Sequence, residues 1–404
     1  MDEFKKGWGA LLAATFGTMC GLVTVTNYSQ GFLVGPVTAE FGWSTPQFFL
    51  GFTVMMCMGL ICAPIVGSLA GKYGVRLLGI VGLIGHALSY VIISFNPGSL
   101  PLWYLSFALL AILGAGSLPV IWTTILNDYF KKHKGKAIGI TMTGTGIGAL
   151  ILPQATSYIV EVYGWRTAYQ AIGVGALVLS LPLVIALFKP NTQAQNDTAE
   201  QNSQPSWGMT RAEAMKQKQF WILGAVLFIT VFVVVGLLSN FKPILLSKNL
   251  DGSTIAQVAS IMGLTIIFGR MAAGFLVDKF WAPAVGALFF TMPIIAILLL
   301  VYVPSSAVVA LIIALTVGLA AGAELDLLAY LTSKYFGSKH YPSVFGCVFA
   351  FFTVSAGIAP PIFGGVANKF GYDTILMISA GLLVLSIFLF LSLGKYPEQE
   401  ALQE

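Results

Sequence analysis

GSLAGKY at residues 67–73 returns as GFLVDKF at residues 274–280, so one short pattern occurs twice at a distance of 207 residues. The same distance joins three further pairs of positions: Gly139 with Gly346, Pro153 with Pro360, and GWRT at 164–167 with GYDT at 371–374. A common offset at four places indicates that the chain contains two copies of one structural unit. In membrane carriers, parallel repeats of this kind form two bundles with the solute site between them near the midplane.

The segments around these patterns are long and apolar. The 404-residue chain is 57% apolar and 9% charged, with a mean hydropathy of +0.86, whereas soluble domains carry about 25% charged residues. About 20 apolar residues span a bilayer core as a helix. Twelve segments of this kind lie near residues 9–35, 47–70, 76–96, 102–126, 137–160, 168–188, 219–241, 255–277, 283–303, 306–332, 343–367 and 374–394. The predicted fold is therefore an all-α integral membrane protein whose twelve transmembrane helices form two pseudo-symmetric six-helix bundles.

A polar stretch interrupts the apolar pattern in the middle of the chain. Residues 189–217 include KPNTQAQNDTAEQNSQPSWGM and predict a flexible cytoplasmic linker. It separates an N-terminal bundle, residues 1–188, from a C-terminal bundle, residues 218–404. At its end, Thr210 and Glu213 have the spacing of a capping box, which predicts a short amphipathic helix before the seventh segment.

The distribution of charge predicts the orientation. If the N-terminus is cytoplasmic, sixteen of the 21 lysine and arginine residues fall on the cytoplasmic side and four on the outer side. The positive-inside rule then predicts a multi-pass protein of the inner or plasma membrane with both termini cytoplasmic. The lysines are spread over loops, so we expect no nucleic-acid-binding patch. The four cysteines lie in apolar segments without disulfide or metal-ligand spacing, and we expect no cofactor and no metal site.

Only three full charges lie clearly inside the apolar segments: Arg270, Glu324 and Asp326. An ionised side chain at bilayer depth costs about 2.5–3.5 kcal/mol on insertion scales, so each of them should face the protein interior or a wet cavity. Counted from Asp278 and Lys334 with a rise of about 1.5 Å per residue, Arg270 and Asp326 lie roughly 12 Å from the cytoplasmic edge and Glu324 about 15 Å. All three therefore share one layer near the midplane.

The chemistry of Arg270 favours an organic anion as the substrate, because its planar guanidinium matches a carboxylate through two parallel charge-assisted bonds. The alternative is a permanent pair with Asp326 or Glu324 that only fixes helix packing. These two acids are about 200° apart around a helix, so they cannot both face one cavity. Asp326 lies on the same face of its helix as Tyr330, and we expect these two side chains to face the solute cavity between the bundles. Either acid could carry a coupling proton, and a structural ion pair is the alternative.

Polar and aromatic side chains in two other segments are further candidates for substrate contact. Asn27, Tyr28 and Gln30 form a polar cluster in the outer half of the first segment, and Trp122 lies in the fourth. For each of them the alternative is hydrogen bonding or packing between helices.

The repeated loop pattern resembles the G-x-x-x-D-[RK]-x-G-[RK] signature of the major facilitator superfamily. The matching residues are Gly67, Lys72 and Arg76 in the first copy and Gly274, Asp278 and Lys279 in the second. The resemblance implies that these residues gate the cytoplasmic ends of the two halves. Gly71 stands where the family usually has Asp, so we expect the lock in the first half to be weaker or built differently.

A narrower resemblance, to the monocarboxylate porter-like branch of that superfamily, covers most of the chain. It rests on APIVGSLAGKYGVRLL at 63–78, NDYFKKHKGKAIGITMTGTGIG at 127–148, VYGWRTAY at 162–169, and Arg270 followed by Gly274. The resemblance implies that Arg270 binds the substrate carboxylate and that the protein acts as a monomer. The branch often carries an acid four residues before this arginine and a lysine in the first helix, both implicated in proton coupling. Ile266 and Tyr28 stand at these places, so a lactate-type proton symport mechanism does not transfer directly.

We therefore expect a secondary active transporter that moves a small organic anion by alternating access. Its transport could be coupled to protons. The alternatives are a carrier of neutral or cationic solutes, of drug or sugar type, that uses Glu324 or Asp326, and an anion exchanger. An enzyme is not expected, because we find no nucleophile with a paired base, no metal-ligand cluster and no phosphate-cradling loop.

Overall fold

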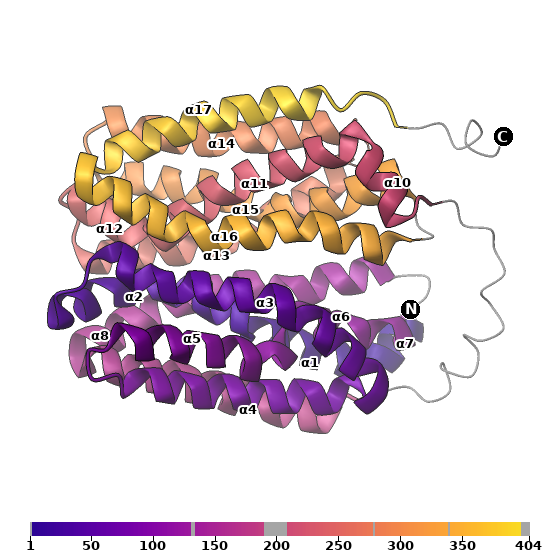
Figure 1. Ribbon diagram of the computed structural model, residues 1–404, viewed down its shortest axis with the longest axis horizontal. Helices are drawn as coiled ribbons and strands as arrows, with labels where there is room; N and C mark the ends of the chain where they lie inside the picture. Colours follow the sequence, from indigo (N-terminus) through magenta and orange to yellow (C-terminus); the bar gives the residue numbers. More distant parts are fainter. Residues whose placement is uncertain (1, 131–133, 190–207, 278, 338–339, 397–404) are drawn as a thin grey trace.

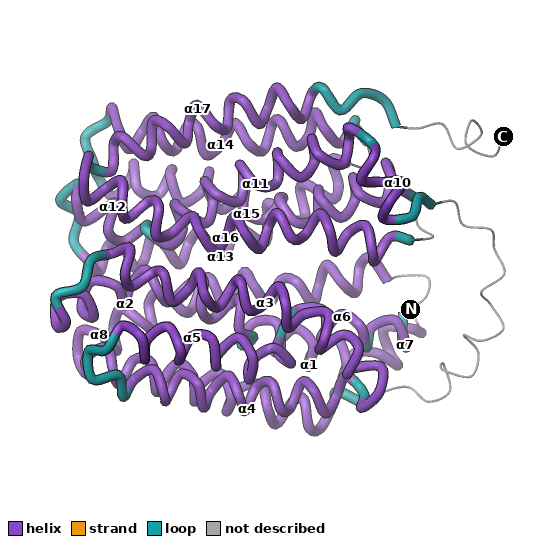
Figure 2. Tube along the Cα trace, viewed as in Figure 1, coloured by secondary structure: helices purple, strands orange, loops and turns teal. Residues whose placement is uncertain are grey.

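The computed structural model describes residues 2–130, 134–189, 208–277, 279–337 and 340–396. This part of the chain is almost entirely helical (Figure 2). Eleven of its helical stretches are long and apolar enough to cross a membrane. One of them, Lys136–Leu187, is broken at Gly164, where φ is +83° and ψ is +168°, so it supplies two spans. The twelve predicted spans are therefore confirmed in the described chain.

The first half contains six spans. They consist, in chain order, of α1 (Asp2–Met19) with α2 (Leu22–Phe41), α3 (Thr45–Tyr73), α4 (Val75–Ser94), α5 (Leu100–Gly114) with the short helices η1 (Ala115–Ser117), α6 (Pro119–Thr124) and α7 (Leu126–Tyr129), and the two arms of α8 (Lys134–Leu187).

The second half begins with a short helix and contains the other six spans. These are α10 (Arg211–Lys216), α11 (Lys218–Ser239) with α12 (Phe241–Ser247), α13 (Gly252–Val277), α14 (Ala282–Tyr302), α15 (Ala307–Phe336), α16 (Tyr341–Phe370) and α17 (Tyr372–Leu391). The predicted capping box starts α10, since the Thr210 side chain accepts from the Glu213 amide and the Glu213 carboxylate accepts from the Thr210 amide.

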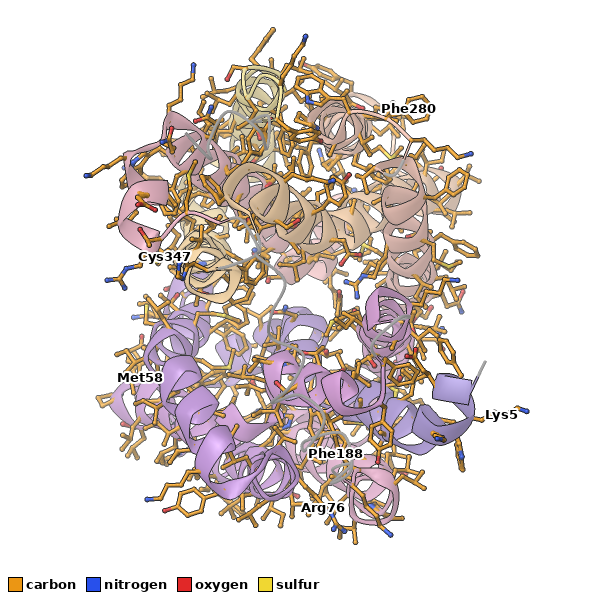
Figure 3. The ribbon with its side chains drawn as sticks, turned by 90° about the vertical axis from the view of Figure 1, so that its right-hand side faces the viewer. Lys5, Met58, Arg76, Phe188, Phe280 and Cys347 are labelled. Atoms are coloured by element: carbon orange, nitrogen blue, oxygen red, sulfur yellow. The ribbon has the colours of Figure 1, made fainter. Side chains whose placement is uncertain are left out.

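The two halves form two bundles that lie side by side (Figure 1). The start of α1 and the end of α17 lie at the same end of the molecule as α10, which we call the α10 end, and α12 lies at the opposite α12 end. Viewed from the α10 end, Lys5, Arg76 and Phe188 lie in the first bundle and Phe280 in the second (Figure 3).

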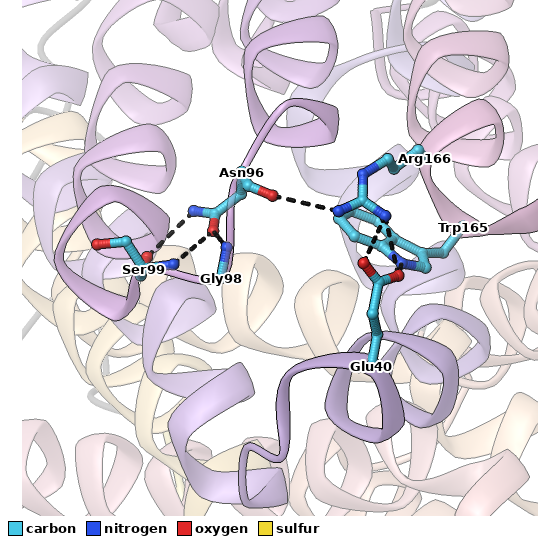
Figure 4. Close-up of polar contacts among 6 residues, drawn as sticks. All are labelled: Glu40, Asn96, Gly98, Ser99, Trp165 and Arg166. Atoms are coloured by element: carbon cyan, nitrogen blue, oxygen red, sulfur yellow. Dashed lines mark hydrogen bonds and ion pairs between the residues drawn. The ribbon is translucent and has the colours of Figure 1, made fainter.

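Equivalent positions of the repeat have equivalent structures at the α12 end. Gly164 and Gly371, which are 207 residues apart, both have φ of +83°, a conformation that favours glycine. In the first half the Arg166 guanidinium pairs with Glu40 at 2.7 Å, and the Trp165 Nε1–H donates to the same carboxylate (Figure 4). In the second half Lys248 pairs with Asp373, also at 2.7 Å. Asp373 is the repeat position of Arg166, and Lys248 follows the repeat position of Glu40 by one residue, so a similar ion pair occurs in the second half with its charges reversed.

Two spans of the first bundle are interrupted at the same place. The first span breaks at Gly21, which is extended, and the fourth passes through the 3₁₀ turn η1. The Ser117 hydroxyl accepts from the Leu22 amide at 3.1 Å, and the Thr24 hydroxyl donates to the Thr18 carbonyl at 2.7 Å. Backbone groups that leave a helix inside a membrane need partners of this kind, because lipid offers none.

Glycines bring the two bundles together toward the α12 end. Gly146 of α8 packs against Ile267 and the backbone of Gly263 in α13, and Gly31 of α2 packs against the backbone of Ser239. On the other side of the molecule, Thr53 of α3 donates a hydrogen bond to the Gly357 carbonyl of α16. Missing side chains let helix backbones approach closely, which is the usual device for packing helices in lipid.

Candidate functional site

Arg270 lies at the seam between the two bundles. Its side chain is 9% exposed, and its Nη1 donates to the Met142 carbonyl of α8 at 2.7 Å. On the other side its Nε lies 3.2 Å from Asp326 Oδ2 in α15. Of the two acids of α15, Asp326 is therefore the ion-pair partner of Arg270, and the guanidinium joins both halves of the repeat rather than facing lipid.

The two acids of α15 lie in different surroundings. The Asp326 side chain keeps 37% of its surface exposed, beside Arg270. Glu324 is 5% exposed and lies in a small cavity between α11, α14, α15 and α17. Its Oε1 has no hydrogen-bond partner among the described residues. Apart from Thr230 and Glu324 itself, the lining of this cavity is apolar: Leu223, Val226, Leu227, Phe290, Leu327, Leu328, Leu331 and Phe390.

The polar cluster of the first span divides between two faces of the helix. Tyr28 lies one turn before Gly31, on the face turned to the second bundle, and interacts electrostatically with Arg270 and Glu324. Its neighbour Asn27 is partly buried, with an Oδ1 that has no partner among the described residues. Gln30, in contrast, is 2% exposed and accepts from the Tyr169 hydroxyl at 2.8 Å. This contact lies inside the first bundle, whereas the buried Gln30 Nε2 has no hydrogen-bond partner among the described residues.

Trp122 also lies inside the first bundle. Its side chain is fully buried, its ring packs edge-on against Phe188 at 5.2 Å, and its Nε1–H donates to the Ser117 carbonyl at 2.9 Å. Gly17 of α1 packs against the face of the same ring. Every one of these contacts lies within the first bundle, as the packing alternative expects.

Tyr330 lies one turn beyond Asp326 toward the α10 end. It is partly exposed, and the Lys334 ammonium lies 5.5 Å from the centre of its ring. It therefore shares a helix face with Asp326, as the helical spacing predicts.

The loop-signature residues that the structure describes contact their own bundle. Lys72 lies over the ring of Tyr73, Arg76 donates to the Ile185 carbonyl, and Lys279 lies over the ring of Phe275. A side chain at Gly67 or Gly274 would meet no atom within 4 Å. Asp278 lies outside the described residues.

The contact between Arg270 and Met142 was not predicted. Its acceptor is a backbone carbonyl, which no residue type identifies in a sequence. The nearest signal was the glycine series Gly144, Gly146 and Gly148 in the same arm of α8. Gly146 allows α13 to approach, while Gly144 and Gly148 pack against the first span.

The described part of the chain holds no group of three or more His, Cys, Asp or Glu side chains that could bind a metal ion. Arg270 has the chemistry of an anion-binding group, because a guanidinium forms charge-assisted hydrogen bonds with carboxylates, and it lies at the interface between the two bundles.

Comparison with known proteins agrees with this architecture. Residues 11–340 match the family model of the Major Facilitator Superfamily. Monocarboxylate transporter 12 of Rattus norvegicus is 26% identical to the chain, over 96% of the chain and 86% of the relative. Monocarboxylate transporter 11 of Homo sapiens is 24% identical, over 96% and 83% respectively. Among solved structures, a bacterial homologue of the human lysosomal transporter Spinster, in an inward-facing and occupied conformation, superposes with a TM-score of 0.71.

That structure is 17% identical and covers 95% of this chain and 96% of its own, so it supports the fold alone. The family match covers most of the chain and includes both copies of the repeated pattern. The chain belongs to the major facilitator superfamily, as a membrane transporter similar to the monocarboxylate transporters.

Proposed function

We propose that this protein is a secondary active transporter of a small, monocarboxylate-like organic anion, with Arg270 as the carboxylate anchor. One observation carries the proposal: a guanidinium at mid-membrane depth is held between the Met142 carbonyl of one bundle and Asp326 of the other. A substrate carboxylate that displaces Asp326 would form two charge-assisted hydrogen bonds with the Arg270 guanidinium. Asn27, Tyr28 and Tyr330 are proposed to complete the binding site.

Alternating access follows from the position of Arg270 at the seam. The domains of residues 1–188 and 218–404, joined by the linker 189–217, would rock about the anchor in the plasma or inner membrane, with both termini cytoplasmic. Glycine contacts toward the α12 end support a structure that is closed on that side. Gly67, Lys72, Arg76, Gly274, Asp278 and Lys279 are proposed to meet across the α10 end in the opposite state.

Substitution of Arg270 tests the anchor. In proteoliposomes, Arg270→Gln should reduce monocarboxylate uptake by roughly 10²-fold or more, because loss of one partner of a buried charge pair costs about 2–5 kcal/mol. Arg270→Lys should retain only part of the uptake, since a lysine ammonium cannot form two parallel hydrogen bonds with a carboxylate. Arg166→Gln is the matched control, because that arginine pairs with Glu40 at the exposed α12 end. Undiminished uptake by folded Arg270→Gln protein would refute the proposal.

Proton coupling is proposed to involve Glu324 rather than Asp326. An ionised carboxylate in an apolar cavity costs several kcal/mol, and protonation removes that cost. The other side chains that line this cavity are apolar except for Thr230, whose hydroxyl donates to the Val226 carbonyl of its own helix. Tyr28 of the proposed substrate site interacts electrostatically with both Glu324 and Arg270 and so connects the two. Glu324 would therefore gain or lose its proton as the substrate site changes occupancy.

Glu324→Gln separates coupling from binding. We expect wild-type uptake to accelerate several-fold under an inward proton gradient, and the variant to lose this response while it still exchanges labelled for unlabelled anion across the membrane. Loss of exchange in a folded variant would instead place Glu324 in substrate binding. If the wild-type protein exchanges anions but its uptake does not respond to the proton gradient, it is an anion exchanger, and the proposed proton coupling is refuted.

A second candidate function is favoured by the Arg270–Asp326 pair itself. If Arg270 only balances charge, Asp326 or Glu324 could bind a neutral or cationic solute. Asp326→Asn distinguishes the candidates: it should leave carboxylate binding intact or stronger if Arg270 is the anchor, and abolish solute binding if Asp326 is the ligand. Thermal-shift titration with monocarboxylates, dicarboxylates, sugars and amines gives the readout.

A further inference from the structure

A groove on the second bundle lies apart from the transport site. It has a volume of about 580 Å³ and is lined by Trp221, Ala225, Phe228 and Ile229 of α11 and by Ala350, Phe351 and Val354 of α16. This volume falls in the range of small-molecule sites, about 300–1,000 Å³. None of its lining side chains is charged, and none belongs to the transport site.

The groove opens on the outer face of α11. The opposite face of this helix carries Leu223, Leu227 and Thr230, which line the buried cavity of Glu324. Trp221 is 53% exposed and Val354 is 41% exposed. Exposed apolar side chains on a membrane span face lipid, so the occupant of this groove comes from the bilayer.

The groove is preformed, because aromatic rings fix its floor. Phe351 packs edge-on against Trp221 with ring centres 6.1 Å apart, and against Phe220 at 6.2 Å. Gly224 lies against the Phe351 ring, which draws α11 and α16 together. The small side chains of Ala225 and Ala350 then leave the hollow between the two helices.

Two lysines lie close in the chain to the α10 end of the groove. Lys218 is one turn before Trp221 on the same stripe of α11, and Lys216 ends α10; both are exposed. The Trp221 Nε1–H donates to the Met215 carbonyl at 2.9 Å, which holds α10 against the groove. The Glu213 carboxylate accepts from the Thr210 amide, which lowers the pKa of Glu213 and keeps its charge at the start of α10.

We infer that this groove binds one acyl chain of an anionic phospholipid, whose phosphate contacts Lys216 and Lys218. The apolar groove accommodates the acyl chain, and the lysines form charge-assisted hydrogen bonds with the phosphate at the depth of the membrane surface. The lipid would bridge α11 and α16 beside α10. Since the Met209 amide donates to the Phe336 carbonyl at 2.8 Å, α10 is also tied to the end of α15, which carries both acids. The inference does not depend on which solute is carried.

Brominated phospholipids test this binding, because bromine on an acyl chain quenches tryptophan fluorescence on contact. The full-length protein is reconstituted in phosphatidylcholine vesicles that contain equal fractions of brominated phosphatidylglycerol or brominated phosphatidylcholine. The Trp221 contribution is the difference between the wild type and Trp221→Phe. We expect quenching of Trp221 by the brominated phosphatidylglycerol to exceed that by the phosphatidylcholine at least two-fold.

Two variants and a control complete the test. In the double variant Lys216→Gln/Lys218→Gln, the two brominated lipids should quench Trp221 equally. In Ala225→Phe, whose new side chain fills the groove, quenching by either lipid should fall. Lys395 is an exposed lysine beyond α17, and Lys395→Gln should change neither the lipid preference nor the extent of Trp221 quenching. If the double variant does not fold, salt serves instead, because screening should abolish the preference in the wild type. Equal quenching by the two lipids, or a preference that survives both salt and the double substitution, overturns the inference.

Discussion

At the scale of single residues, the same side-chain chemistry has different roles in neighbouring places. Glu324 and Asp326 are two residues apart on α15, yet one is enclosed by apolar side chains and the other pairs with Arg270. The helical period alone separates them. Trp122 and Trp221 differ in the same way, since the first fills the interior of a bundle and the second faces outward.

The buried position of Trp122 leads to a prediction about stability rather than substrate affinity. Trp122→Ala should lower the free energy of unfolding by about 3–5 kcal/mol, as for other large-to-small changes in a core. It should lower the thermal midpoint measured in detergent. The more conservative Trp122→Phe should fold and leave the dissociation constant for carboxylates unchanged. Trp8→Ala is the control, because Trp8 is 58% exposed and should change stability little. Weaker substrate binding by Trp122→Phe without a change in midpoint would contradict this assignment.

At the scale of helices, close approach between the bundles depends on glycines. Gly263 of α13 packs against the backbone of Ala149 and Leu150 in α8, one turn on from the Gly146 contact. This packing brings α13 close enough for Arg270 to reach the Met142 carbonyl.

Gly263→Leu should therefore prevent the two bundles from closing toward the α12 end. We expect transport to fall at least tenfold, while the protein still inserts and elutes as a single species. Gly381→Leu on α17 is the matched control, because a side chain at Gly381 meets no atom within 4 Å. Normal transport by Gly263→Leu would mean that this contact is not part of the cycle.

At the scale of the whole molecule, the glycines describe two bundles that meet at one end. Gly31, Gly146 and Gly364 pack against the opposite bundle toward the α12 end, whereas a side chain at Gly139 or Gly346, near the α10 end, meets no atom within 4 Å. Gly139 and Gly346 are equivalent positions of the repeat, so the difference follows from the arrangement of the bundles and not from the local sequence.

A disulfide across the α12 end should stop the transport cycle. A side-chain Cβ at Gly364 would lie 3.0 Å from the Cβ of Thr45, and disulfides need about 3.5–4.5 Å, so a small adjustment allows the bond. Oxidised Thr45→Cys/Gly364→Cys protein should lose uptake, and reduction should restore it. Each single variant should transport under both conditions. Uptake that persists in fully oxidised protein would show that the α12 end does not need to open.

Much of this architecture could be predicted from the sequence. Hydropathy and the repeat of 207 residues predicted the twelve spans and the two bundles, since a helix in lipid must be long and apolar whatever surrounds it. The rise per residue, counted along α13 and α15 from their cytoplasmic ends, also predicted that Arg270 and Asp326 share one layer. The helical period predicted that Glu324 faces away from Asp326.

Tertiary structure decided what each polar side chain meets. Gln30 and Trp122 were candidates for substrate contact in the sequence, and the structure places their hydrogen bonds within the first bundle. The Met142 carbonyl, the interruptions at Gly21 and 115–118, and the groove between α11 and α16 arise where separate helices meet. A sequence specifies the faces of a helix, whereas only the packing of helices against one another determines which face meets substrate, lipid or protein.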